Sequence, residues 1–268
     1  MKLNLAIALT VLLATAASAF GQKETVKTTT ETKTKTETKT VETKMPAVKM
    51  PTAQEILAKY VQAIGGRANY EKIKSRMTKG TQEIPAAGIK GTFEIYAAAP
   101  NKISNKSVIP GIGEFNDRFD GQTAWSSNPI QGSRDKTGEE LAQAKLINNF
   151  YREINLEKLY PKMEIKGTEK IGANEAYVVV ATPADNLPAE TLYFDTKSGL
   201  LLCQDAILIT PEGKTPTKTF FEDLREVDGV KMPFKMRTIL PQFEVIITMT
   251  EVKNNVAVED AVFAKPKV

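Results

Sequence analysis

The chain has 268 residues, with 36 basic and 32 acidic side chains, one cysteine and no histidine. Without histidine it lacks the usual general base near neutral pH, the base of Ser–His and Cys–His pairs, and the commonest metal ligand. Lys2 and residues 23–49 carry the whole surplus of positive charge. The remainder is electrically balanced and lacks the basic excess typical of nucleic-acid-binding proteins. We therefore expect no catalytic activity, no metal site and no cofactor.

Residues 1–22 have the pattern of a secretory signal peptide. Lys2 precedes an apolar run over 5–14, and Ala17-Ser18-Ala19 matches a small-residue cleavage site. The run is too short to span a bilayer, no later stretch reaches spanning length, and no cysteine follows the cleavage site. We therefore expect cleavage near Ala19 and a periplasmic protein that is neither membrane-spanning nor lipid-modified there. The sequence leaves secretion to the exterior open.

Residues 23–50 consist largely of Lys, Thr and Glu. Because they hold few apolar side chains, they cannot bury enough surface to fold, and we predict a disordered linker. Such a linker serves either as a solvated spacer or as a weak contact to anionic lipid or cell wall.

The folded region is predicted to begin with a helix over 52–64. Thr52 and Glu55 form a capping-box pattern, and apolar residues then recur at helical spacing until Gly65. Residues 126–136 are rich in Ser, Asn, Gly and Pro and predict a loop. Between these segments we expect a short helix over 70–74, a first strand that includes Arg76, strands over 89–97, 102–109 and 114–119, and a short strand ending at Trp125.

A second capping-box pattern, from Thr137 to Glu140, opens a predicted helix over 138–150. A short helix is expected over 156–160. Turn residues then divide the C-terminal half into antiparallel strands. The expected strands are 163–171, 176–182, 190–195, 200–210, 217–227, 230–240 and 243–252.

The strand over 230–240 has one apolar and one polar face. Lys231, Lys235 and Arg237 share the polar face, and Pro233 indicates an edge or a bulge. This alternation is typical of an antiparallel sheet with one solvated face. The apolar face carries Val230, Met232, Phe234, Met236, Thr238 and Leu240.

About ten such strands predict a mainly β (α+β) fold in one domain over 51–268. We expect a single large curved antiparallel sheet that forms an unclosed barrel. Its apolar face needs a cover, and the amphipathic helices over 52–64 and 138–150 are available for that purpose.

Three strings carry a resemblance to a known superfamily: FDGQTAW at 119–125, YFDTKSGLLLC at 193–203 and FEDLREVDGVKMPFKM at 221–236. With the order of signal, helix, strands, central helices and strands, the chain resembles the periplasmic lipoprotein-carrier superfamily, the LolA-like and LolB-like proteins. The resemblance implies an unclosed barrel around an apolar cavity that takes acyl chains. It also implies an interior arginine on an early strand that controls a lid, and Arg76 is the candidate.

The apolar face of the sheet is the candidate ligand cavity, since methionine-rich surfaces suit variable apolar ligands. Cys203 lies in an apolar run and is interpreted as a buried small hydrophobe, with a reactive or dimer-forming thiol as the alternative. The candidate cavity residues are Met77, Phe93, Ile95, Trp125, Met232, Phe234, Met236, Val245, Ile247 and Met249.

Three functions remain open from the sequence. The first is an exported, non-enzymatic carrier that holds an acyl chain or a lipidated protein in an apolar cavity. The second is a structural or adaptor module of the cell envelope with a packed core, no ligand and a protein partner. The third, an exported hydrolase, is disfavoured because no nucleophile motif is present. A cavity of several hundred Å³ separates the first from the second.

Overall fold

A computed structural model describes residues 50–265 of the chain. The predicted signal peptide (1–22) and, apart from Met50, the predicted linker (23–50) lie outside the described residues. The helices and helical turns within the described range are α2 (Ala53–Ala63), α3 (Arg67–Tyr70), η1 (Pro85–Ala87), α4 (Gly138–Ile147), η2 (Arg152–Ile154), α5 (Leu156–Leu159) and η3 (Asp260–Val262).

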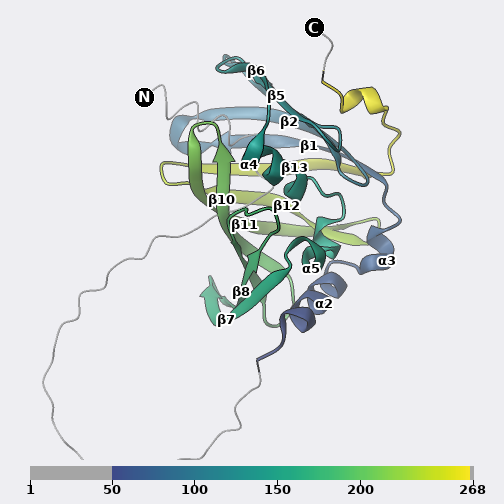
Figure 1. The fold of residues 1–268 in the computed structure, drawn as a ribbon, viewed down its shortest axis with the longest axis vertical. Coiled ribbons are helices and arrows are strands. Elements are labelled where there is room, and N and C mark those ends of the chain that lie inside the picture. The colour runs from purple at the N-terminus through teal and green to yellow at the C-terminus, as the bar shows by residue number, and fades with distance from the viewer. Residues whose placement is uncertain (1–49, 266–268) are drawn as a thin grey trace, which may run out of the picture.

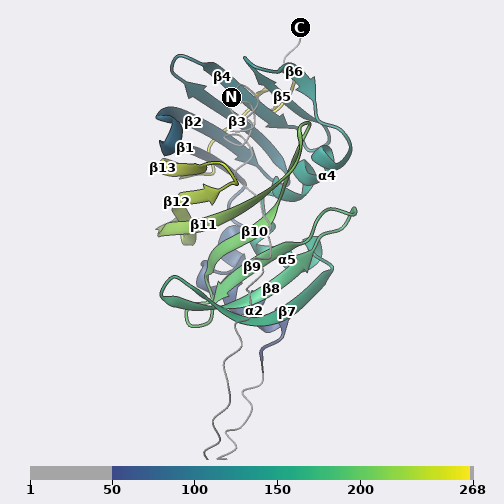
Figure 2. The same ribbon diagram turned by 90° about the vertical axis from the view of Figure 1, so that its left-hand side faces the viewer.

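Thirteen antiparallel strands form one sheet, in the order β6-β5-β4-β3-β2-β1-β13-β12-β11-β10-β9-β8-β7. Figure 2 shows its strong curvature, with the β1–β6 half above the β7–β10 half. The strands are β1 (Ser75–Ile84), β2 (Ile89–Ala98), β3 (Lys102–Ile109), β4 (Gly113–Phe119), β5 (Ala124–Asn128), β6 (Gly132–Asp135), β7 (Lys162–Ile171), β8 (Asn174–Thr182), β9 (Glu190–Asp195), β10 (Leu201–Thr210), β11 (Gly213–Val227), β12 (Val230–Ile239) and β13 (Glu244–Asn254).

The sheet stays open, because β6 and β7 form its two edges in the described part of the chain. These edge strands are consecutive in the sequence, so residues 136–161 must cross from one edge to the other. The crossover, which contains α4 and α5, runs over the inner, concave face (Figure 1). The predicted unclosed barrel with helical cover is therefore confirmed.

Helix α2 covers the lower half of the inner face. Its capping box forms as predicted: the Glu55 N–H donates to Thr52 Oγ1 at 3.2 Å, and the Thr52 N–H donates to Glu55 Oε2 at 2.7 Å. Beneath it lies the larger apolar cluster of the molecule. This lower cluster holds Ile56, Leu57, Tyr60, Ile64, Tyr70, Ile73, Ile154, Leu156, Tyr160, Val179, Ala181, Leu192, Phe194, Leu201 and Val230.

A second apolar cluster lies in the upper half, near the β1–β2 and β3–β4 hairpins. The last residues of the described chain cover the outer face of the same half at the opposite ends of β3 and β4. Phe263, next to η3, is only 1% exposed. Arg118 Nη1 donates to the carbonyl of Ala264 at 2.8 Å, and Lys265 pairs with Asp135 at 2.9 Å. The upper cluster holds Ile84, Phe93, Ile109, Phe115, Leu208, Leu240, Val245 and Ile247.

Three local predictions are corrected. The loop predicted over 126–136 is wrong, because this region forms most of the β5–β6 hairpin. The helix predicted over 138–150 ends at Ile147, and the short helix predicted over 70–74 lies at Arg67–Tyr70.

Pro233, which was predicted to mark an edge or a bulge, lies inside the sheet. It is in a part of β12 beyond the pairing with β13, so its missing N–H costs no ladder bond to that neighbour.

Candidate ligand-binding site

Two adjoining cavities lie between the crossover and the inner face of the sheet. The α4 cavity has a volume of about 90 Å³ and lies beneath α4, and the central cavity has a volume of about 270 Å³. Because they share wall residues, the two cavities lie side by side. The shared residues are Ile95, Ile103, Ile147, Asn148, Met236 and Met249.

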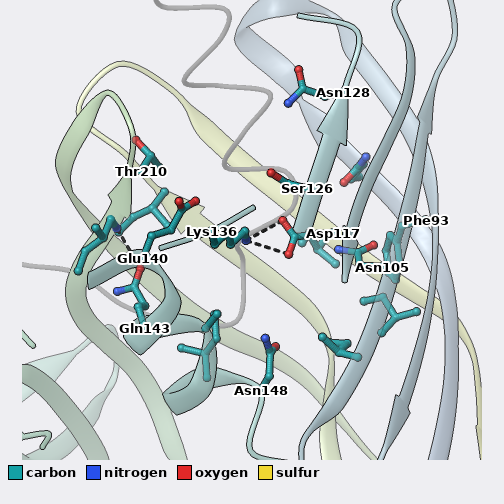
Figure 3. Close-up of a pocket in the computed structure, with 18 of the residues that line it drawn as sticks. Phe93, Asn105, Asp117, Ser126, Asn128, Lys136, Glu140, Gln143, Asn148 and Thr210 are labelled. Atoms are coloured by element: carbon teal, nitrogen blue, oxygen red, sulfur yellow. Dashed lines mark hydrogen bonds and ion pairs between the residues drawn. The ribbon is translucent and has the colours of Figure 1, made fainter. Parts of the chain in front are cut away.

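One wall of the α4 cavity is a row of polar side chains (Figure 3). Asn105 pairs with Asp117 across β3 and β4, Asp117 pairs with Ser126 on β5, and Ser126 pairs with Arg134 on β6. Residues opposite one another in an antiparallel ladder share a face, so all four point inward. We call Asn105, Asp117, Ser126 and Arg134 the polar row.

The charges at the polar row are matched by residues at the start of the crossover. Lys136 Nζ lies 2.8 Å and 2.7 Å from the two carboxylate oxygens of Asp117. Arg134 donates two hydrogen bonds of 2.7 Å to Glu140. Burial raises the pKa of Asp117 above its ordinary value although Lys136 opposes the shift. Both ion pairs are internal to the site.

The opposite wall is apolar and comes from strands far apart in the sequence. Met236 of β12 pairs with Ile247 of β13, and Met249 of β13 pairs with Gly80 of β1, which in turn pairs with Phe93 of β2. These side chains line the α4 cavity, and Met236 and Met249 also line the central cavity. Unbranched methionines at the junction adapt to ligands of different shape.

Arg76 lies in the wall of the central cavity, as the candidate interior arginine on an early strand. Its Nε donates to Asn254 Oδ1 at 2.8 Å, and its guanidinium lies 5.9 Å from the ring centre of Phe150 in the crossover. Burial lowers the pKa of Arg76 from its ordinary value, partly offset by Tyr70 and Glu153. The cation thus lies between the sheet and the segment that covers it.

Helix α4 is fastened to the sheet by a buried glutamine, in addition to the ion pairs of Glu140 with Arg134 and of Glu139 with Lys214. Gln143 Nε2 donates to the carbonyl of Ile207 at 2.7 Å, and the Ile209 N–H donates to Gln143 Oε1 at 2.9 Å. The only other buried residue of α4 is Ala144. Leu141, Leu146 and Ile147 are partly buried, so apolar contacts hold the helix together with the two hydrogen bonds of Gln143.

The far end of the crossover is fastened by a buried network. Arg152 Nη2 donates to Tyr160 Oη at 2.7 Å and to Glu190 Oε2 at 2.9 Å. Tyr160 and Gln204 also donate to Glu190 Oε2, at 2.5 Å and 2.6 Å. Burial, reinforced by Glu190, raises the pKa of Tyr160 well above its ordinary value, so its hydroxyl stays protonated as a donor.

Six of the ten candidate cavity residues line the two cavities: Phe93, Ile95, Met232, Met236, Ile247 and Met249. Their contact with a ligand stays a prediction. The other four, Met77, Trp125, Phe234 and Val245, do not line either cavity.

Each of these four has a physical reason for its position. Met77 lies between Arg76 and Thr78, which both line the central cavity, so its side chain points to the outer face. Trp125 precedes the inward Ser126 and lies under the outward Arg118, at 5.7 Å. Phe234 lies beneath Arg225, at 4.6 Å, and Val245 is enclosed in the upper cluster.

Cys203 is buried against Tyr193 and Ala176, as interpreted from the sequence. Burial raises the pKa of its thiol to about 12, although Lys218 opposes the shift. Within residues 50–265, no three His, Cys, Asp or Glu side chains gather as a metal site, and no helix is long and apolar enough to cross a membrane.

The polar row was not predicted from the sequence, and neither was the place of Gln82 and Gln143 in the wall of the α4 cavity. The strands that carry Asn105 and Asp117 were predicted, but not that these side chains face a cavity. Ser126 and Arg134 stand where an apolar residue would signal an inward position, so their hairpin was predicted as a loop. A glutamine within a helix gives no sign of the backbone groups it meets. The fit of both only becomes visible once β4, β5, β6 and β10 are placed.

A curved antiparallel sheet, open at two edges and crossed by helices, is a half-barrel fold. No protein-family model and no curated protein matches the sequence. Among solved structures, a DUF1329 family protein from Desulfovibrio piger superposes with a TM-score of 0.54 at 12% identity, over 79% of this chain and 96% of that chain. A LolA superfamily protein from Nitrosomonas europaea superposes with a TM-score of 0.53 at 14% identity, over 81% of this chain and 99% of that chain. The chain therefore has a LolA/LolB-like fold.

Proposed function

We propose that this protein is an exported, non-enzymatic carrier that holds an acyl chain, free or attached to a protein, in the central and α4 cavities. The observation that supports it is the unfilled, methionine-lined space between the crossover and the sheet. A volume of about 270 Å³ is close to the lower end of small-molecule sites. A fully packed core, as required by the adaptor hypothesis, would leave no such space.

Export and a periplasmic location are part of the proposal and are supported by the sequence of residues 1–22. Binding would be driven by burial of apolar surface at roughly 25 cal/mol per Å². Release would require α4 to move from the mouth of the α4 cavity. Gln143 and Ala144 are the only fully buried residues of α4, which limits the cost of this movement.

The test is native mass spectrometry of the mature protein from the envelope fraction, with organic extraction of whatever co-purifies. We expect a lipid or acylated adduct. Met236→Glu puts a charge at the junction of the cavities, and occupancy should fall about tenfold or more because that charge must be desolvated against the chain. Val108→Glu, at an exposed position of β3 that lines neither cavity, is the matched control and should keep the adduct.

Ile147→Trp is a second variant, which adds bulk from the helix side to the wall that both cavities share and leaves the sheet unchanged. It should also lose the adduct. A mass without adduct, together with no uptake of added fatty acid or lipopeptide by the unmodified protein, would support the adaptor hypothesis instead.

A further inference from the structure

We propose that the α4 cavity is a head-group site for an amphipathic lipid whose head is uncharged and carries hydroxyl or amide groups. This inference rests on the proposed carrier function and adds the class of ligand. It is carried by a buried glutamine side chain without a partner, facing a wall whose charges are already matched.

Gln82 of β1 is the residue without a partner. Its side chain is 1% exposed and lines the α4 cavity, yet within the described part of the chain neither its Oε1 nor its Nε2 has a hydrogen-bond partner. Its strand neighbours are Gly91, which has no side chain, and Ile247, which is apolar. Buried amides are almost always hydrogen-bonded, so this one indicates a polar group that binds beside it.

An amide offers one acceptor and two donor hydrogens at adjacent atoms. A hydroxyl matches it well, because one oxygen both donates to Oε1 and accepts from Nε2, and another amide does the same. A phosphate or carboxylate only accepts, so it would leave Oε1 unpaired and force two acceptors together. The chemistry of Gln82 therefore favours a neutral head that both donates and accepts.

The facing wall supports the same class of ligand. The charged residues in the lining of the α4 cavity are Asp117, Arg134, Lys136 and Glu140. They form two ion pairs with N–O distances of 2.7 Å, and Figure 3 shows the Lys136–Asp117 pair. With two cations matched to two anions, the described lining has no net charge to attract an anion. The remaining polar groups include Ser126, whose hydroxyl suits neutral hydrogen bonding.

Size and position complete the assignment. The α4 cavity, at about 90 Å³, accommodates only a small group. The larger central cavity, at about 270 Å³, lies on the other side of the shared methionines. A ligand with its polar end at Gln82 would place its chain past Met236 and Met249 into the central cavity. The site would thus fix the direction in which the lipid lies.

The test compares three probes that share one lauroyl chain: monolaurin, which has hydroxyl groups, laurate, which is an anion, and methyl laurate, which cannot donate. Affinities for the full mature protein are measured by calorimetry at neutral pH. We expect monolaurin to bind about tenfold more tightly than methyl laurate, and laurate no better than methyl laurate.

Gln82→Leu, of similar volume, should remove the preference for monolaurin and leave the affinity for methyl laurate unchanged. It should also raise the melting temperature of the ligand-free protein, because an unpaired buried amide is removed. Thr81→Val, the adjacent position with its side chain on the opposite face, is the control and should keep the preference.

Equal affinities for monolaurin and methyl laurate would mean that water alone satisfies Gln82, and tighter binding of laurate would mean an anionic head. Either result, or an unchanged preference in Gln82→Leu, overturns the head-group inference and leaves the carrier function standing. No binding of any of the three probes overturns both.

Discussion

Gln82 and Gln143 are two buried glutamines at the same cavity that differ in their hydrogen bonds to the protein. Both amide atoms of Gln143 are bonded to the β10 backbone, at 2.7 Å and 2.9 Å, so this residue belongs to the framework. Neither amide atom of Gln82 is bonded within the described residues, so it is available to a ligand. Burial alone does not separate the two, and only the accounting of hydrogen bonds does.

Cys203 provides a prediction at the scale of the residue. Since its thiol pKa is raised to about 12, the thiolate needed for reaction is scarce at pH values near 8. We expect the native protein to react with Ellman's reagent at least about a thousandfold more slowly than the denatured chain. Complete labelling of the native protein within minutes, or a disulfide-linked dimer on a non-reducing gel, would establish the reactive-thiol alternative.

Local motifs in the sequence predicted some residues correctly and others not, because tertiary partners compete for the same atoms. The pattern of Thr52 and Glu55 forms a complete capping box. The same pattern at Thr137 and Glu140 does not, since the Glu140 carboxylate binds Arg134 twice and the Thr137 side chain makes no cap bond. A bidentate ion pair is stronger than a cap bond, so the motif alone could not predict the outcome.

At the scale of the element, strands with one apolar face were predictable and strands with a polar inner face were not. Alternation placed β12 and β13 correctly, and their inward residues Met236, Ile247 and Met249 line the site. The β5–β6 hairpin was predicted as a loop because its inward residues, Ser126 and Arg134, are polar. The polar wall of the candidate site was therefore not predicted, because its inward side chains are polar.

Helix α4 gives the prediction that belongs to this scale. Gln143→Ala removes both bonds to β10 and leaves two backbone groups to find new partners, at about 1–3 kcal/mol for each buried group. Because Ala144 is the only other fully buried residue of α4, we expect local opening rather than global unfolding, seen as faster amide hydrogen exchange in 138–147 and faster lipid release. Lys145→Ala, exposed on the same helix, is the control. Unchanged exchange in Gln143→Ala would show that other contacts hold the helix.

For the whole molecule, the decisive feature is that consecutive strands β6 and β7 form opposite edges of one sheet. The chain between them has to cross the inner face, so a cover over the cavity follows from topology. The two ends of this crossover are held differently. The α4 end has partly exposed polar contacts, and the end at Arg152 has a fully buried network. The Arg152 network fastens its end of the crossover to β9 and β10, so the α4 end is the one that we expect to open.

The last prediction tests the fixed end of the crossover. Arg152→Met leaves the Glu190 carboxylate buried without its cation, which typically costs about 3–5 kcal/mol. We expect a lower free energy of unfolding in urea by that amount, with the loss shared by both halves of the sheet. Arg225→Met breaks the exposed pair with Asp223 and should cost about 0–1 kcal/mol. If both variants lose the same small amount, the Arg152 network does not anchor the crossover, and the cover would have to be free to move as a whole.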